Sequence, residues 1–357
     1  MSSEVVQYKP ERDYWNIVKG VGMIAIIIGH SCMDPVANYV YMFHIQLFFF
    51  VSGYLYSESK YGDDPWLNLK NKLKGLWLPY FIIISIFVLL HNVISLIGMQ
   101  PEGTMDYSLK DMLVRICYAM FGVSDEFLAG PVWFLRTLAM AMIIFGFIVA
   151  LSRLIEAKTN FAFKIIVQLI LIIALTVLGY PLIASHTQLP ADMQIAFEMM
   201  PFIWVGYFLR NYIGSIDKLL NIIVGLIAFV IVGIVSSFQD LDMAMGNIFP
   251  YMHIVAFLGI YGCLSLSKLL CKWNISRKVF SIIGSISLYI MVVHFVVIRA
   301  IDKVTYIVCD KPAYELMTNI IYWIIYVIII VAISVTVSFG IKKAVDAVKT
   351  ILTKAES

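Results

Sequence analysis

The first apolar segment reads Lys19-Gly-Val-Gly-Met-Ile-Ala-Ile-Ile-Ile-Gly-His30, with an ionisable residue at each end. At about 100° and ~1.5 Å per residue, eleven helical steps return to nearly the same face, about 16 Å further along the axis. One helix face therefore carries a lysine near one membrane surface and an imidazole near the other. Because a charged residue inside a span costs about 2.5–3.5 kcal/mol on insertion scales, both residues are candidates for function.

The composition assigns the chain to the membrane proteins. Of the 357 residues, 61% are hydrophobic and 14% are charged, and the mean hydropathy is +0.89. Such values exclude an ordinary soluble domain. The polar start of the chain runs into a span that continues through Lys19, without the short apolar run and cleavage site of a signal peptide, so we expect this span to be retained.

Apolar runs of about 20 residues predict an all-α, polytopic integral membrane protein with about ten transmembrane helices around a polar central cavity. The predicted spans are 14–33, 36–56, 76–98, 131–151, 164–184, 193–213, 219–237, 250–268, 279–300 and 316–341. Twenty of the 26 Lys and Arg residues fall on one side of these spans and six on the other. By the positive-inside rule, both termini are predicted to be cytoplasmic.

Two stretches have the pattern of amphipathic helices that lie on a membrane surface. In 108–121, an apolar stripe follows Ser108, and Asp111 is placed three residues later as a capping partner on the outer face. The tail 341–357 places apolar residues on one face and lysines elsewhere, as a cytoplasmic anchor does. No repeat or soluble domain is evident, so 1–357 is predicted to be a single transmembrane domain.

Five ionisable side chains from five predicted helices fall at similar depth in the outer half of the membrane: His30, His44, Arg136, Glu198 and His294. Each would be costly there unless it faced a shared polar cavity and found partners. Each also has a structural interpretation. The histidines could bond to backbone carbonyls, Arg136 could anchor at the interface with Glu198 as its counter-ion, and Lys19 could extend to the headgroups.

The chemistry that these residue types favour is proton transfer through a histidine. Metal catalysis is poorly supported, because no His-Glu-x-x-His or similar close pair occurs, and no metal is predicted. A serine triad is also disfavoured, because the sequence around Ser52 is no nucleophile elbow. A neutral histidine in a cavity of low dielectric can deprotonate a hydroxyl, a step that typically contributes about 10²–10⁴ in rate.

Several motifs occur in a family-like order. They are Lys19 with His30 after ten intervening residues, Met42-Phe-His44-Ile-Gln-Leu-Phe-Phe-Phe-Val-Ser-Gly53, Lys72-Leu-Lys74-Gly-Leu-Trp-Leu-Pro79-Tyr80, Pro131-Val-Trp133-Phe-Leu135 and Ser287-Leu-Tyr289-Ile-Met-Val-Val-His294. From about residue 12 to 300 the chain resembles the membrane-bound acyltransferase-3 family, most closely its fucose 4-O-acetylase-like branch. Asn16 stands where that family commonly has Asp.

The resemblance implies an integral-membrane O-acyltransferase that passes an acyl group, acetyl above all, from cytoplasmic acyl-CoA to a hydroxyl of a cell-surface glycan or lipid-linked sugar. Acetyl-CoA would be a donor substrate rather than a permanently bound cofactor. Lys19, Lys72 and Lys74 would meet its phosphates, and the pantetheine arm would cover the ~16 Å to His30.

In the implied mechanism His30 is the general base, and His44, Arg136 and His294 line the cavity or stabilise the oxyanion. A covalent acyl-histidine is an alternative route. The implied partners are the lipid bilayer, acyl-CoA and the acceptor sugar, with no nucleic acid, in the plasma membrane, as in a bacterial inner membrane.

A second hypothesis from another class is a transporter or flippase for a glycan or lipid-linked sugar, which would use the same cavity without making a bond. The sequence shows no convincing pair of corresponding broken helices, which a transporter built from inverted repeats would carry. The acceptor, the choice between acetyl and succinyl, and the oligomeric state are left open by the residues.

Overall fold

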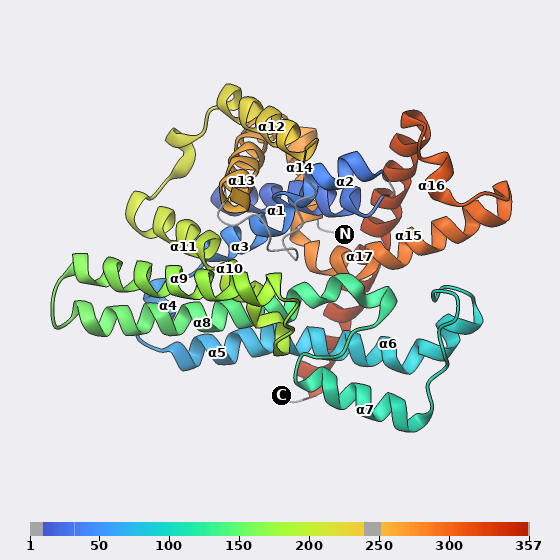
Figure 1. Cartoon of the computed structure of the whole chain (residues 1–357), viewed down its shortest axis with the longest axis horizontal. Helices are drawn as coiled ribbons and strands as arrows, with labels where there is room; N and C mark the ends of the chain where they lie inside the picture. The colour runs from blue at the N-terminus through green and yellow to red at the C-terminus, as the bar shows by residue number, and fades with distance from the viewer. Residues whose placement is uncertain (1–9, 32, 239–250, 356–357) are drawn as a thin grey trace.

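The computed structural model describes residues 10–31, 33–238 and 251–355, and the regular elements of these ranges are all helical (Figure 1). The helices are α1 Pro10–Gly29, α2 Asp34–Tyr41, α3 His44–Tyr54, α4 Glu58–Tyr61, α5 Pro65–Lys72, α6 Leu78–Leu96, α7 Leu109–Met120, α8 Trp133–Glu156, α9 Phe161–Ala184, α10 Met193–Glu198, α11 Met200–Phe208, α12 Ile222–Ser236, α13 Tyr251–Leu270, α14 Asn274–Ser285, α15 Ser287–Cys309, α16 Ala313–Leu316 and α17 Ile320–Ala355.

Six helical stretches in the described ranges are long and apolar enough to cross a membrane. They are Asp34–Tyr54, Pro65–Leu96, Phe127–Glu156, Phe161–Ala184, Tyr251–Leu270 and Ile320–Ile351. A seventh forms if α14 and α15, which meet at 83°, count as one bent span. The protein is therefore a multi-pass helical membrane protein, and each of these stretches matches one of the ten apolar runs.

The other three predicted spans correspond to helices that fall short of this standard. Helix α1 carries charged residues in its first half, α12 has only 15 residues, and the run 193–213 divides into α10, α11 and a π-helical turn. Helix α10 ends at Glu198, and α11 begins at Met200 with Pro201 in its first turn, where the missing N–H of proline breaks no helical hydrogen bond. These three segments are helical, but length and composition alone do not qualify them as membrane spans.

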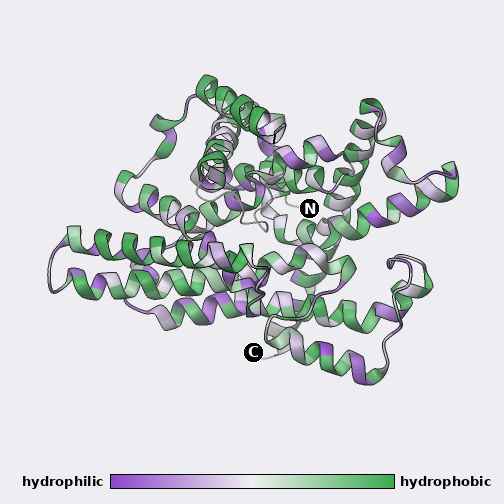
Figure 2. Ribbon diagram, in the orientation of Figure 1, coloured by the Kyte–Doolittle hydropathy of each residue, from purple (hydrophilic) through white to green (hydrophobic). Residues whose placement is uncertain are grey.

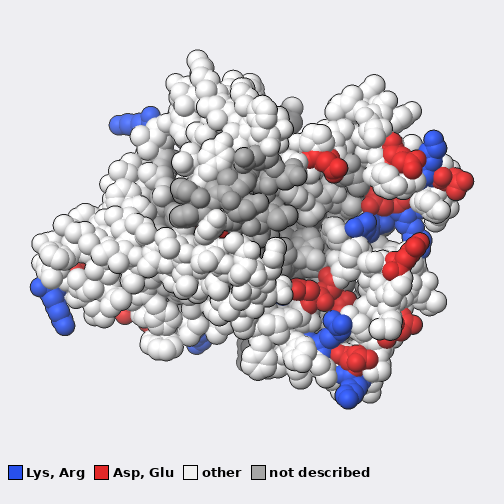
Figure 3. Space-filling view, in the orientation of Figure 1, with Lys and Arg blue, Asp and Glu red and all other residues white. Residues whose placement is uncertain are grey.

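Helix α9 shows how the membrane reverses the usual pattern of a protein surface. Its exposed side includes Ile170 and Ile173, while Gln168 is fully buried. The Gln168 amide donates to the hydroxyl of Ser152 on α8 and accepts from the indole of Trp204 on α11. Figure 2 shows the apolar outer faces of these helices, and in Figure 3 most charged side chains lie towards the right-hand end of the molecule, with a few at the left end and along the lower edge. Lipid therefore covers the apolar sides, and polar groups join helices inside.

Helix α7 begins as the sequence predicts. Ser108 and Asp111 form a reciprocal capping box, in which the Ser108 hydroxyl accepts from the Asp111 N–H and the Asp111 carboxylate accepts from the Ser108 N–H. The hydrogen bonds from Ser108 lower the pKa of the Asp111 carboxyl below its usual range. The helix packs along α6.

Two predicted boundaries differ in the structure. Lys72 and Lys74 were expected in a basic loop, but they lie in one helical stretch that runs from Pro65 to Leu96 through a π-helical turn at Leu73–Trp77. The tail 341–357 was expected as a separate segment, but α17 continues without a break through its described part to Ala355.

Helix α1 lies at the centre of the half of the molecule that holds α2, α3, α13, α14 and α15, and it contacts all five (Figure 1). Its closest neighbour is α14, where a Cβ at Gly284 would collide with the carbonyl oxygen of Asn16. Glycine is required at this position because the two backbones approach so closely. The tight packing fixes the path of α1 and therefore the position of the residue that follows it, His30.

Candidate active site

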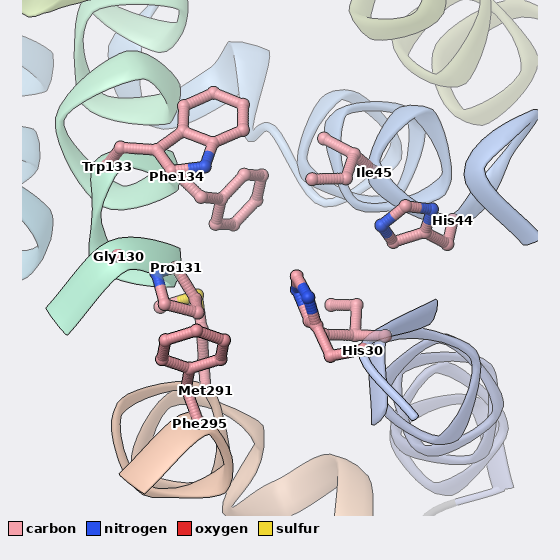
Figure 4. Close-up of a pocket in the computed structure, with 10 residues that line it drawn as sticks. His30, His44, Ile45, Gly130, Pro131, Trp133, Phe134, Met291 and Phe295 are labelled. Atoms are coloured by element: carbon pink, nitrogen blue, oxygen red, sulfur yellow. The ribbon is translucent and has the colours of Figure 1, made fainter. Parts of the chain in front are cut away.

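A cavity of about 140 Å³ lies where four segments meet: the end of α1, the start of α3, the 3₁₀ turn Phe127–Val132 with the start of α8, and the middle of α15. Two of the predicted site residues, His30 and His44, face it (Figure 4). The full lining is Ile26, His30, His44, Ile45, Gly130, Pro131, Trp133, Phe134, Met291 and Phe295. Apart from the histidines and the indole of Trp133, the lining side chains are apolar.

His30 stands immediately after the last residue of α1, and its backbone N–H still donates to the carbonyls of Ile26 and Ile27. In Figure 4 its imidazole points from the end of the helix into the cavity. The hydroxyl of Tyr41 lies 3.5 Å from His30 Nδ1. The end of α1 therefore positions the imidazole of His30, and the hydroxyl of Tyr41 is close enough to orient this ring.

His44 is positioned by a break in the predicted span 36–56. Helix α2 ends at Tyr41, and α3 begins at His44. His44 Nδ1 lies 2.8 Å from the carbonyl oxygen of Val40. Because a carbonyl only accepts hydrogen bonds, Nδ1 carries the proton and Nε2 has the lone pair. The ring also stacks on Tyr41, with 5.1 Å between centroids.

His294 contacts His30 from α15, with 5.5 Å between the ring centroids. It is fully buried. Its Nδ1 donates to the carbonyl of Ile290, 3.0 Å away, and its Nε2 has no hydrogen-bond partner among the described residues. The structure therefore brings three predicted histidines together, and two of them share the same tautomer.

Arg136 lies outside the lining of the cavity. Its buried guanidinium donates to the carboxylates of Asp125 and Asp192, at 2.6 and 2.8 Å, and also to the Tyr80 hydroxyl and the Ser124 carbonyl. Two carboxylates therefore compensate its charge, rather than Glu198. Such a fork of charge-assisted hydrogen bonds holds the turn before α8 against α6 and the segment before α10.

Glu198, which was expected in the shared cavity, is also elsewhere. It is fully buried, and neither of its carboxylate oxygens has a partner among the described residues. Its backbone carbonyl accepts from Nε2 of His253. Similar depth in the membrane therefore did not mean a shared cavity for all five ionisable residues.

Within the part of the chain that the structure describes, no lysine lines the histidine cavity. Lys19 is half-buried on α1, Lys72 is half-buried at the end of α5, and Lys74 is exposed in the π-helical turn. Lys74 borders an open, mostly apolar groove of about 650 Å³ that reaches Met120. Another pocket, of about 500 Å³, lies at the opposite end of α1 from His30, and Tyr14, Trp15, Arg210 and Lys268 are among its lining residues.

Sequence reasoning missed several neighbours of the histidines. Tyr41 and Phe295 contact His30 directly, and Trp133 was noted only as part of a motif. Arg299 follows Met291 and Phe295 on the same face of α15, and its guanidinium lies over the rings of Phe127 and Phe295. The spacing of four residues between Met291, Phe295 and Arg299 could have predicted that these three residues share one face of α15.

Metal ligation was also considered. Within the described ranges, no group of three or more His, Cys, Asp or Glu residues is arranged to hold a metal ion. The arrangement instead offers imidazole nitrogens, one hydroxyl and one indole N–H around a small space. Such groups can move a proton and donate hydrogen bonds to a reacting molecule.

The fold and the cavity define a multi-pass helical membrane protein with a cluster of histidines inside it. The chain matches the sequence model of the acyltransferase-3 family, described as an acyltransferase domain, over residues 12–339. The match covers most of the 357 residues, so the chain belongs to this family, and the predicted family is confirmed. Comparisons with curated proteins and with solved structures found no match.

Proposed function

We propose that the protein is an O-acyltransferase that transfers an acetyl group from cytoplasmic acetyl-CoA to a hydroxyl of a cell-surface glycan or lipid-linked sugar. His30 carries this proposal, because it lines the cavity and neither of its ring nitrogens is bonded to a backbone carbonyl of the described residues, in contrast to His44 and His294. The plasma membrane, as in a bacterial inner membrane, and the fucose 4-O-acetylase-like branch belong to the same proposal.

His30 acts as the general base. When its Nδ1–H donates to the Tyr41 hydroxyl, the Nε2 lone pair is available to the cavity. Nε2 takes the proton of the acceptor hydroxyl as that oxygen attacks the thioester carbonyl, and the protonated ring then gives the proton to the departing CoA sulfur. The ring of His294 packs against that of His30.

The size of the cavity favours a short acyl group. Its volume of about 140 Å³ is close to that of an engineered protein cavity of ~150 Å³ that holds benzene. An acetyl group and the hydroxyl that attacks it fit in such a space, whereas a succinyl group brings four more heavy atoms and a charge into apolar walls. This observation supports acetyl over succinyl.

The donor enters along α1 in this proposal. Lys19 lies about 16 Å below His30 along the helix, and the pocket at the far end of α1 adds Arg210 and Lys268. Cations on this side attract the phosphates of CoA, and Arg binds phosphate in bidentate geometry. Lys72 and Lys74 are not among the lining residues of that pocket, and they join the proposed donor site through the charge bias of the sequence, which assigns them to the cytoplasmic side.

The test is a CoA-release assay on the purified protein in lipid nanodiscs, with acetyl-CoA and succinyl-CoA compared. We expect acetyl-CoA turnover that falls at least a hundredfold in His30→Ala, and a higher KM for acetyl-CoA in Arg210→Gln. His186→Asn is the matched control, because His186 is exposed in a turn with positive φ that Asn tolerates. Full turnover in His30→Ala would contradict the general base, and no turnover in the wild type would contradict the enzyme.

Mass spectrometry of the surface glycans with and without the gene identifies the acceptor. An added acetyl mass on one sugar supports the proposed reaction. Loss of glycan export with unchanged acylation would support the transporter instead.

A further inference from the structure

The proposed reaction places a negative charge on the thioester carbonyl oxygen. The histidines offer few free N–H groups that could donate a hydrogen bond to this oxygen. His44 and His294 each use Nδ1–H on a backbone carbonyl and keep Nε2 as an acceptor. Arg136, the other predicted candidate, is bound by Asp125 and Asp192 outside the cavity. A preorganised donor is usually the largest single contribution to such catalysis, so another group must supply it.

Trp133 has the required N–H. It is the first residue of α8, and only Val132 separates it from the lining residues Gly130 and Pro131 of the 3₁₀ turn. Its side chain lines the cavity, and in Figure 4 its indole nitrogen is on the side of the ring that faces the interior. Trp204 and Trp323 donate their indole N–H groups to side-chain oxygens, whereas that of Trp133 has no acceptor among the described residues. An indole nitrogen is a donor only, so on this half-buried ring it is available to a molecule in the cavity.

Two features hold Trp133 in position. Phe134 packs edge-on against its ring, with 6.5 Å between centroids. The turn before it is fixed by Arg136, which binds the carbonyl of Ser124 and the carboxylate of Asp125. The donor is therefore placed before substrate arrives, which preorganisation requires.

We propose that the indole N–H of Trp133 donates a hydrogen bond to the acyl carbonyl oxygen and stabilises it as an oxyanion. His30 and Trp133 approach the cavity from different walls (Figure 4), so that one activates the hydroxyl and the other binds the carbonyl oxygen. This inference rests on the proposed acyl transfer.

The acceptor oxygen bonds to the carbonyl carbon, its proton moves to His30, and the C=O electron pair moves to the oxygen bound by Trp133. When C=O re-forms, the C–S bond breaks, and the thiolate of CoA takes the proton back from His30. Trp133 gives up no proton, so it serves every turnover unchanged.

The test compares variants that separate the N–H from the ring. Trp133→Phe keeps an aromatic wall and removes the donor, so we expect kcat for acetyl-CoA turnover to fall about a hundredfold with KM changed less than threefold. Trp133→His restores a ring N–H, and its kcat should exceed that of Trp133→Phe at least fivefold. Trp66→Phe is the matched control, because Trp66 is 68% exposed in the groove beside Lys74.

A kcat of Trp133→Phe within threefold of the wild type would overturn the inference, and a loss only in Trp133→Ala would show that the ring acts as a wall. If Trp133→Phe does not fold, the comparison of Trp133→His with Trp133→Leu decides, because leucine has no donor, and equal kcat values contradict the role of the N–H. Wild-type activity is measured in the same assay. Its absence counts against acyl transfer itself, whereas an active wild type with unaffected variants counts against Trp133 alone.

Discussion

Arg136 shows at the scale of one residue how buried charge is compensated. Its side chain is 4% exposed and binds two carboxylates. Because removal of the guanidinium leaves the carboxylate of Asp192, which is 7% exposed, buried without its cation, we expect Arg136→Gln to destabilise the protein by about 3–5 kcal/mol. The thermal midpoint of the purified protein should fall clearly, while acetyl-CoA turnover per folded molecule falls less than tenfold.

Lys158→Gln is the control for Arg136, since Lys158 is exposed in the turn between α8 and α9. An unchanged midpoint together with lost turnover would support the catalytic role that the sequence suggested for Arg136.

We predict that Tyr41 orients the imidazole of His30 and does not itself react with the substrate. Its hydroxyl lies 3.5 Å from His30 Nδ1, and its ring stacks on His44. Tyr41→Phe keeps the ring and removes the group that orients the imidazole, so kcat should fall about three- to tenfold. Tyr39→Phe serves for comparison, because the Tyr39 hydroxyl binds the carbonyl of Phe229 instead. Equal kcat values for the two variants in the CoA-release assay would show that the Tyr41 hydroxyl has no role.

At the scale of helices, the sequence predicted the apolar runs well because 20-residue hydrophobic segments have few alternatives in a membrane. It did not predict the break between α2 and α3 that positions His44, because the residues at the break, Met42 and Phe43, are apolar like their neighbours. It also did not identify Asp192 as a partner of Arg136, since 56 positions separate the two residues.

The crossing of α3 and α11 depends on two glycines. A Cβ at Gly53 would collide with the carbonyl oxygen of Ile203, and one at Gly206 with that of Phe50. The backbone cannot yield as a flexible side chain does, so Gly53→Ala should cost at least the 1–3 kcal/mol typical of overpacking. Because α3 begins at His44, the variant should also lower acetyl-CoA turnover.

Gly340→Ala provides the matched control for Gly53. A Cβ at Gly340 meets nothing within 4 Å, and alanine in a helix is favoured over glycine by up to about 1 kcal/mol. Its thermal midpoint should equal or exceed that of the wild type. A Gly53→Ala protein as stable as Gly340→Ala would mean that the two helices do not cross so closely.

At the scale of the whole molecule, the arrangement separates two polar regions by the length of α1. The histidine cavity lies at one end and the pocket with Arg210 and Lys268 at the other. The bend of 83° between α14 and α15 lets α14 pack along α1 while α15 brings His294 to His30. A donor bound at one membrane surface could therefore reach a base near the other, provided that these two ends face opposite sides of the membrane.

Cysteine labelling tests that orientation. Helix α17 has 36 residues, so it is about 54 Å long and exceeds the ~30 Å hydrocarbon core. Glu315 before it and Lys349 near its end are both exposed and should lie on opposite sides of the membrane.

Because the basic bias places Lys349 in the cytoplasm, a membrane-impermeant maleimide should label Glu315→Cys in intact cells, in a background with the five native cysteines replaced by serine. Lys349→Cys should react only after permeabilisation. The reverse pattern would invert the proposed path of the donor, and labelling of both in intact cells would mean that α17 does not cross the membrane.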